Sequence, residues 1–274
     1  MATALDEAFA KAKKDDRCAL IGYVVAGDPD METSRAVIDA IVEAGVDIVE
    51  LGIPYGDPLA DGPTIAAGGQ RAIAAGANID GVLRLVGQTK APVILFTYVN
   101  PILQYGIEKF AMGAKRYGVV GVIIPDVPLE ELDPIREVIR KNGLIMPLLI
   151  SPTTPDERMR KIASDSEGFT YLVSRLGVTG AKDAPDTTSV RAQLEKLRKM
   201  TGRPIAAGFG ISKAPHIVAV RDYTDGVIVG SAIVDAYASA KGAANAAAAA
   251  TRLVRLLRLA CKRTAAAPAA ASAT

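Results

Sequence analysis

Short apolar runs alternate with longer amphipathic stretches along the whole chain. Eight of these runs are continuous and rich in β-branched residues, as in parallel strands that are buried on both faces. The predicted strands are Ala19–Val25, Ile48–Leu51, Val93–Thr97, Gly121–Ile124, Met146–Ile150, Phe169–Val173, Ile205–Ala207 and Gly226–Val229. Because helical periodicity separates them, the chain consists of repeated strand–helix units.

Helices are predicted between these strands, and several of them are followed by a glycine of the kind that ends a helix in a left-handed conformation. The predicted helices include Met31–Ala44, Ile107–Tyr117, Leu129–Asn142, Pro155–Ala163 and Ser189–Thr201. The glycines expected to end helices are Gly45, Gly118, Gly143 and Gly202. An extra helix at Met1–Lys14 is expected to close the floor of the fold, and Ala243–Lys262 to form the last outer helix.

Eight strand–helix units within 274 residues predict a closed (β/α)8 TIM barrel rather than an open doubly wound sheet. Half of the residues are hydrophobic, so a large core is available. No linker divides the chain, and we therefore expect one catalytic barrel domain over residues 1–263. The tail at residues 264–274 is rich in Ala, Ser and Pro and is expected to be disordered.

The charge balance excludes several classes of partner. Thirty-two basic and thirty acidic side chains leave a net charge of +2 without a block of like charge, which indicates neither a nucleic acid nor an anionic membrane. No apolar run is long enough to span a bilayer, and Met1–Arg17 resembles neither a secretory signal nor a plastid transit peptide. We expect a cytoplasmic protein, or a protein of the plastid stroma if the source is a plant or alga.

Cysteine and histidine are too rare for most metal chemistry. Cys18 and Cys261 stand at opposite ends of the sequence, so they are not expected to form a metal site, and a reducing compartment explains them most simply. The single histidine, His216, excludes zinc sites built from several histidines. It is expected on the helix after the seventh strand, in a structural or solvent-facing role.

Glu50 is the strongest candidate for acid–base chemistry. Active sites of TIM barrels lie at the C-terminal ends of the strands, and Glu50 stands near the end of the second predicted strand. Burial there raises the pKa of a carboxyl group, as a general acid requires. The structural alternative is a buried ion pair, but none of the predicted strands carries an Arg or Lys.

Two further carboxylates, Asp57 and Asp61, lie on the Gly- and Pro-rich loop that follows. Aspartate before Gly or Pro is common in turns, so the residues by themselves leave a turn role and a catalytic role open.

Glycine-rich segments after the last strands indicate a phosphate site. In this fold, phosphate is often held by the loops after strands seven and eight together with a helix N-terminus. The corresponding segments here are Gly208–Ser212 and Gly230–Ala232, and Ser231 is expected to cap a helix and donate its hydroxyl. Gly177–Gly180, after the sixth strand, is a further candidate. The alternative to a phosphate site is that these glycines are needed only because the turns are too tight for larger residues.

Aromatic side chains gather at the strand ends. Packing in the barrel core explains them as well as a flat pocket for an aromatic substrate does. These residues are Tyr23, Phe96, Tyr98, Tyr171 and Phe209. No predicted strand contains a lysine, which argues against a Schiff-base aldolase.

With these residues in view, the chain resembles the tryptophan synthase α subunit family from about Asp6 to Lys262. Five segments carry the resemblance, in the order that the family shows. They are Ala26–Pro29, Glu50–Ile65, Pro125–Pro128, Ser174–Gly180 and Gly208–Ile211. The family cleaves indole-3-glycerol phosphate to indole and glyceraldehyde 3-phosphate, without a cofactor.

The resemblance also implies a role for individual residues. It places the two catalytic carboxylates on Glu50 and Asp61, which decides between the two roles left open for Asp61. It implies an indole pocket and a phosphate site made by Tyr23, Tyr98, Ile123, Ile150, Tyr171, Thr179, Gly180, Phe209, Gly210, Gly230 and Ser231. No metal is implied.

The partner implied by the resemblance is a tryptophan synthase β subunit in an α2β2 complex. The loops Pro54–Asp61 and Gly177–Ser189 would close over the substrate and communicate with that subunit. Gly56 and Ala66 depart from the family, which commonly has Ser and Gln there, and Gly56 adds backbone freedom to the first loop.

Other functions remain as alternatives at this stage. The chain could be a stand-alone indole-glycerol-phosphate lyase that releases free indole, as some plant relatives are. It could be another phosphate-binding barrel, although an indole-glycerol-phosphate synthase would need an interior lysine. A non-catalytic barrel that activates a β subunit is disfavoured by the presence of both Glu50 and Asp61.

Overall fold

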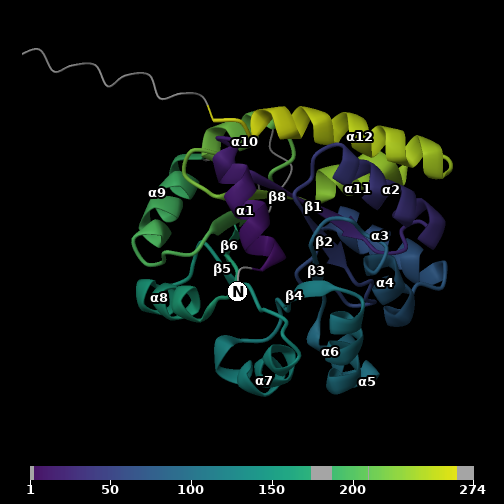
Figure 1. The fold of residues 1–274 in the computed structure, drawn as a ribbon, viewed down its shortest axis with the longest axis horizontal. Coiled ribbons are helices and arrows are strands. Elements are labelled where there is room, and N and C mark those ends of the chain that lie inside the picture. Colours follow the sequence, from purple (N-terminus) through teal and green to yellow (C-terminus); the bar gives the residue numbers. More distant parts are fainter. Residues whose placement is uncertain (1–2, 174–186, 209, 264–274) are drawn as a thin grey trace, which may run out of the picture.

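Eight parallel strands form the centre of the molecule in a computed structural model that describes residues 3–173, 187–208 and 210–263 (Figure 1). All eight predicted strands are present, with small changes in their ends. They are β1 Ala19–Val25, β2 Ile48–Gly52, β3 Val93–Phe96, β4 Val119–Ile123, β5 Leu148–Ile150, β6 Thr170–Val173, β7 Ile205–Gly208 and β8 Gly226–Val229. Neighbours in sequence pair in the sheet from β1 to β4 and from β5 to β8, and β1 pairs with β8, which confirms the predicted TIM barrel.

The barrel is closed between β4 and β5 by one short contact. A single parallel bridge joins Gly121 to Ile145, and the Val122 N–H donates to the Ile145 carbonyl at 2.9 Å. The predicted fifth strand began too early, at Met146. Pro147 has no N–H to give to the sheet, and the Met146 N–H donates instead to Glu167 Oε2 at 2.8 Å.

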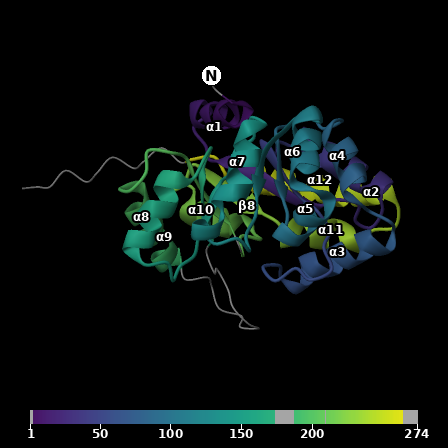
Figure 2. The ribbon, with the colours of Figure 1, turned by 90° about the horizontal axis from the view of Figure 1, so that it is seen from below.

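Helices surround the strands on the outside (Figures 1 and 2). Those that precede β5 are α1 Ala4–Lys14, α2 Met31–Glu43, α3 Pro63–Ala74, α4 Ile79–Val86, α5 Val99–Tyr105, α6 Ile107–Arg116 and α7 Asp133–Lys141. The later helices are α8 Asp156–Asp165, α9 Thr187–Arg198, α10 Ala214–Val220, α11 Ser231–Ala238 and α12 Ala243–Ala260. Leu129–Asn142, predicted as one helix, is divided into a 3-10 turn at Leu129–Glu131 and α7, because Pro134 occupies the first turn of α7.

Three of the four glycines expected at helix ends fulfil that role. Gly45, Gly118 and Gly143 directly follow the C-terminal caps of α2, α6 and α7 with φ values of 111°, 82° and 75°. The prediction for Gly202 was wrong, since α9 already ends at Arg198 and Gly202 is not among the glycines with positive φ.

The N-terminal helix α1 covers one end of the barrel, as Figure 2 shows. Its Phe9 ring lies 5.7 Å from the ring of Phe169, just before β6, and close to Gly226 at the start of β8. Both neighbours mark the N-terminal ends of strands. The helix therefore closes the floor as predicted, and the opposite end is left for a site.

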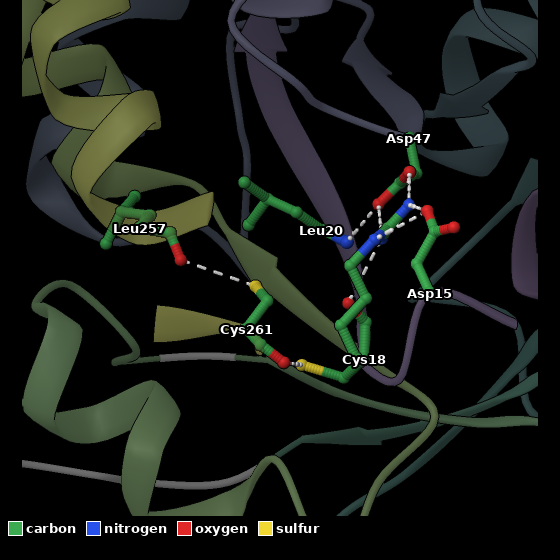
Figure 3. Close-up of polar contacts among 7 residues, drawn as sticks. Asp15, Cys18, Leu20, Asp47, Leu257 and Cys261 are labelled. Atoms are coloured by element: carbon green, nitrogen blue, oxygen red, sulfur yellow. Dashed lines mark hydrogen bonds and ion pairs between the residues drawn. The ribbon is translucent and has the colours of Figure 1, made fainter. Parts of the chain in front are cut away.

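The two cysteines meet at this floor although 243 positions separate them (Figure 3). Cys18 Sγ donates to the Cys261 carbonyl at 3.7 Å, and both thiols are free and buried. The contact with Cys18 and burial raise the pKa of Cys261. Their distance in sequence was therefore a poor guide to their distance in space. Among the described residues, no group of three metal-ligating side chains occurs.

No helix in the described part of the chain combines the length and the apolar character that a transmembrane span requires.

Candidate active site

A cavity of about 180 Å³ lies at the C-terminal ends of the strands, at the end of the barrel that α1 does not cover. Two carboxylates, three aromatic rings and the N-terminal end of α11 meet in it. Its wall consists of Tyr23, Glu50, Asp61, Gly62, Ile65, Phe96, Tyr171, Gly210, Ile211, Ile228, Gly230 and Ser231. The cavity thus brings together residues from β1, β2, β3, β6 and β8 and from the loops that follow.

Glu50 projects into this cavity from β2. The parallel register pairs it with Tyr23 of β1, another residue of the cavity wall. Its side chain is 2 % exposed, and among the described residues Oε2 has no hydrogen-bond partner. Burial raises the pKa of Glu50 from 4.5 to about 8, with a further contribution from the charge of Asp61. At neutral pH this carboxyl group therefore keeps its proton and can donate it.

Asp61 faces Glu50 from the loop that links β2 to α3. Its N–H donates to the Pro58 carbonyl at 3.0 Å, which holds the loop in a turn. Burial raises the pKa of Asp61 from 3.8 to about 6, and a hydrogen bond with Tyr98 offsets part of that rise. At neutral pH Asp61 is mostly ionised, so the two carboxyl groups differ in charge.

Tyr98 positions the loop of Asp61 without lining the cavity. Its hydroxyl accepts the Ala60 N–H at 3.1 Å, and its ring packs against Tyr55 in a tilted arrangement with centroids 5.4 Å apart. Asn100 Nδ2 donates to the Tyr55 hydroxyl at 3.1 Å. Gly56, by contrast, is exposed and has no atom near the position of a Cβ. The loop is thus held at its two ends and free at Gly56.

Two tyrosines fit into the cavity because glycines stand beside them. A Cβ on Gly52 would lie 2.1 Å from the Tyr23 hydroxyl, and one on Gly208 would lie 2.6 Å from the Tyr171 ring. Phe96 meets the Tyr23 ring edge-on at 6.0 Å. Together these rings give the cavity an apolar wall, with Tyr23 and Phe96 on the two strands that flank β2 and Glu50, which suits a flat aromatic ligand.

The other end of the cavity is a helix N-terminus. Gly230 is the N-cap residue of α11 and Ser231 the first residue of that helix, so the expected capping role of Ser231 was wrong. Gly210, with φ of 84°, lines the same end. Free backbone N–H groups and the helix dipole make this end suitable for an anion. His216 lies on α10 as predicted, and its Nδ1 accepts the Ser212 N–H at 3.3 Å.

Some predicted site residues lie elsewhere. Ile123 and Ile150 are fully buried at the ends of β4 and β5 and are not part of the described cavity wall. Thr179, Gly180 and Phe209 lie outside the described residues, as do residues 177–186 of the second predicted loop and the tail at 264–274. Gly62, Ile65 and Ile228 were not assigned to the site from the sequence, although the position of Ile228 within a strand was a signal. Phe96 was named among the strand-end aromatics that could form a pocket, and Ile211 only as part of the segment Gly208–Ser212.

Comparison with known proteins decides the family. The family model of the tryptophan synthase alpha chain matches residues 9–263. The chain belongs to this family. It is 45% identical to the tryptophan synthase alpha chain of Arabidopsis thaliana over 235 residues, 84% of this chain and 85% of that protein. The protein of Prochlorococcus marinus (strain NATL1A) is 44% identical over 243 residues, 87% and 91% of the two chains.

A solved structure agrees with the sequence relatives. Tryptophan synthase of Mycobacterium tuberculosis superposes with a TM-score of 0.87 and 31% identity, covering 96% of this chain and all of that one. Tryptophan synthase alpha chains are the lyases that cleave indole-3-glycerol phosphate in tryptophan biosynthesis. Membership of this family therefore gives the chain its reaction class, a carbon–carbon lyase.

Proposed function

We propose that this chain cleaves indole-3-glycerol phosphate in the described cavity, with Glu50 as the proton carrier. Glu50 donates its proton to indole C3 and then accepts the proton of the C3′ hydroxyl. The bond between C3 and C3′ breaks, its electron pair returns to the indole ring, and the hydroxyl carbon becomes the aldehyde of glyceraldehyde 3-phosphate. Because the ring accepts the electrons, the proposed reaction needs no cofactor.

Asp61 has the second catalytic role in this proposal. As a carboxylate it accepts the indole N–H and stabilises the positive charge that develops on the protonated ring. The single observation that carries the proposal is the pair of carboxyl groups in one apolar cavity, with a pKa of about 8 for Glu50 and about 6 for Asp61. This difference provides an acid and an anion at the same pH.

The remaining site residues bind the substrate. Tyr23 and Tyr171 would contact the indole ring in the cavity, and Tyr98 would hold Asp61 toward it. Gly210, Gly230 and Ser231 would bind the phosphate at the start of α11. Contributions of Ile123, Ile150, Thr179, Gly180 and Phe209 remain predictions from the family resemblance.

Incubation of the purified chain with indole-3-glycerol phosphate tests the proposal. We expect release of indole and glyceraldehyde 3-phosphate in equal amounts. A competing phosphate compound, glycerol 3-phosphate, should raise the apparent KM without lowering kcat. Failure to form indole, alone and with a tryptophan synthase β subunit, would contradict the proposed activity.

The pH dependence of the reaction should follow the two carboxyl groups. Activity requires ionised Asp61 and protonated Glu50, so kcat/KM is expected to increase as the pH passes through about 6, to be highest near pH 7 and to decrease above about pH 8. In Asp61→Asn the pKa of Glu50 should decrease, because the charge of Asp61 contributes to its rise. Stopped assays between pH 5 and 9.5 give the profile, and a rate that keeps increasing above pH 8 would exclude protonated Glu50 as the starting form.

We further propose a β subunit as the partner, docked at the mouth of the barrel. Leu59 on the Asp61 loop and Leu103 on α5 are 80% and 56% exposed, and both lie near this mouth. Large exposed apolar side chains of this kind are common at protein interfaces. A protein that docks there would contact the loop directly, and would restrict Gly56.

Stimulation by the partner is therefore expected to be strong. The exposed Gly56 loses conformational freedom when the loop orders, so the productive loop geometry is a minor population in the free chain. We expect the indole-forming rate to increase about tenfold or more with a saturating β subunit. Gly56→Ser should raise the rate of the lone chain and leave that of the complex nearly unchanged.

A stand-alone lyase is the second candidate, and a specific contact favours it. The packing of Tyr55 against Tyr98 and the hydrogen bond from Asn100 already hold part of the loop in the isolated chain. A fast lone chain with a stimulation ratio near one would establish this alternative. We place either reaction in the cytoplasm, or in the plastid stroma of a plant or alga, where free thiols such as Cys18 and Cys261 persist.

A further inference from the structure

Asp28, in the turn after β1, is a charged residue for which the proposed reaction has no use. Its side chain is completely buried. Arg71 of α3 binds it with two hydrogen bonds, from Nε to Oδ1 at 2.8 Å and from the second guanidinium nitrogen to Oδ2 at 2.9 Å. A buried carboxylate is unfavourable unless such a partner compensates it, so this ion pair fixes where α3 lies.

The packing of α3 against Asp28 leaves no room for a side chain at Gly68. A Cβ on Gly68 of α3 would lie 2.8 Å from Asp28 Oδ2 and 3.2 Å from a methyl group of Val25. The backbone of the helix thus lies directly against the carboxylate, while Arg71 binds it one turn further on. Asp28 therefore fixes both the distance and the rotation of α3 relative to β1.

The same carboxylate also faces α11. Helix α11 packs against β1 next to this turn, and its Tyr237 is fully buried; among the described residues its hydroxyl has no hydrogen-bond partner. Burial and then the charge of Asp28 raise the pKa of Tyr237. Helices α3 and α11 pack against each other on one side of the barrel, as Figures 1 and 2 both show. Asp28 thus stands between β1 and two neighbouring helices.

These two helices carry opposite ends of the active site. Helix α3 begins directly after Asp61 and Gly62 and places Ile65 in the cavity wall. Helix α11 begins at Ser231 after Gly230, at the end proposed for phosphate. The N-terminal parts of the two helices lie close together. A Cβ on Gly230, before α11, would lie 3.5 Å from Ile65 Cδ1 of α3 and 3.4 Å from Tyr23 Cβ.

We propose that Asp28 is a positioning residue that, through Arg71 and the packing of α3 against α11, sets Asp61 at the correct distance from the phosphate-binding start of α11. The inference rests on the proposed function, because it needs Asp61 at the indole end and phosphate at α11. Misplacement of a reacting group by about 1 Å can decrease a rate about 100-fold. Asp28 would therefore affect both turnover and phosphate affinity without touching the substrate.

The test compares Asp28→Asn with a matched variant, Asp47→Asn. Asp47 forms a comparable double hydrogen bond with buried Arg17, at 2.6 and 2.7 Å, but on the floor of the barrel, where it also accepts the Leu20 N–H at 2.8 Å (Figure 3). Both variants remove a carboxylate partner of an arginine and should lower the melting temperature. Only Asp28→Asn is expected to lower kcat, by about tenfold or more, and to weaken glycerol 3-phosphate binding severalfold in calorimetry.

Two further variants keep the result clear if Asp28→Asn folds poorly. Arg71 is 36% exposed, so Arg71→Gln should fold and reproduce both effects, while Arg71→Lys keeps the charge and should restore part of the activity. Parent-like kcat and phosphate affinity in Arg71→Gln, or equal losses in Asp47→Asn, would overturn the proposal. If the parent chain itself forms no indole, the proposed function fails, and the calorimetric comparison still tests the positioning role.

Discussion

Glu50→Gln is expected to abolish indole formation almost completely. The substitution keeps the shape of the side chain but removes its ability to release and accept a proton, and general acid–base catalysis typically contributes about 10²- to 10⁴-fold. Glycerol 3-phosphate should still bind, because the phosphate site at α11 is unchanged. Single-turnover assays measure the loss of rate and calorimetry the retained affinity. Turnover within a few-fold of the parent would show that Glu50 is not the proton carrier.

The same variant should be more stable than the parent, which separates loss of chemistry from loss of fold. The pKa of Glu50 rises from 4.5 to about 8 on folding. Between these values the unfolded chain has released the proton that the folded chain keeps, so the stability of the parent decreases as the pH increases. Above pH 8 the raised pKa of Glu50 lowers the free energy of unfolding by about 5 kcal/mol, at 1.36 kcal/mol per pKa unit. Glutamine does not titrate, so the gain in stability should be large at pH 8.5 and small near pH 4.5.

Ser231→Asp is expected to weaken phosphate binding by orders of magnitude. The new carboxylate would occupy the start of α11, where Ser231 lines the cavity, and would repel a ligand of the same charge. An acidic residue in the first turn suits the helix dipole, so the fold should remain intact. Calorimetry with glycerol 3-phosphate measures the change.

Ser231→Ala serves as the matched control, since it removes the hydroxyl without adding a charge. It should weaken binding far less, because the backbone N–H groups of α11 remain. Unchanged affinity in Ser231→Asp would exclude this helix end from the phosphate site. A similar loss in both variants would instead assign the binding to the hydroxyl.

The sequence by itself determined the barrel and its acid–base residue. Strands buried on both faces produce continuous apolar runs, and this signal is local, so all eight strands were found. Glu50 stood out because a carboxylate within such a run has no solvent to face, and its burial follows from the fold class. Asp61 was assigned only through the family resemblance, because a turn aspartate and a catalytic aspartate have the same local sequence.

Only the tertiary structure decided the features that depend on contacts between segments distant in sequence. The sequence gives no sign that Gly52 makes room for Tyr23, that Cys18 lies beside Cys261, or that Pro147 delays β5. The binding of Asp28 by Arg71 joins residues 43 positions apart, and only the packing of α3 on β1 brings them together. Short-range patterns reveal which elements form, since periodicity repeats within a few residues. Which side chains share a cavity depends on sheet register and helix rotation, and these follow from the packing of the whole barrel.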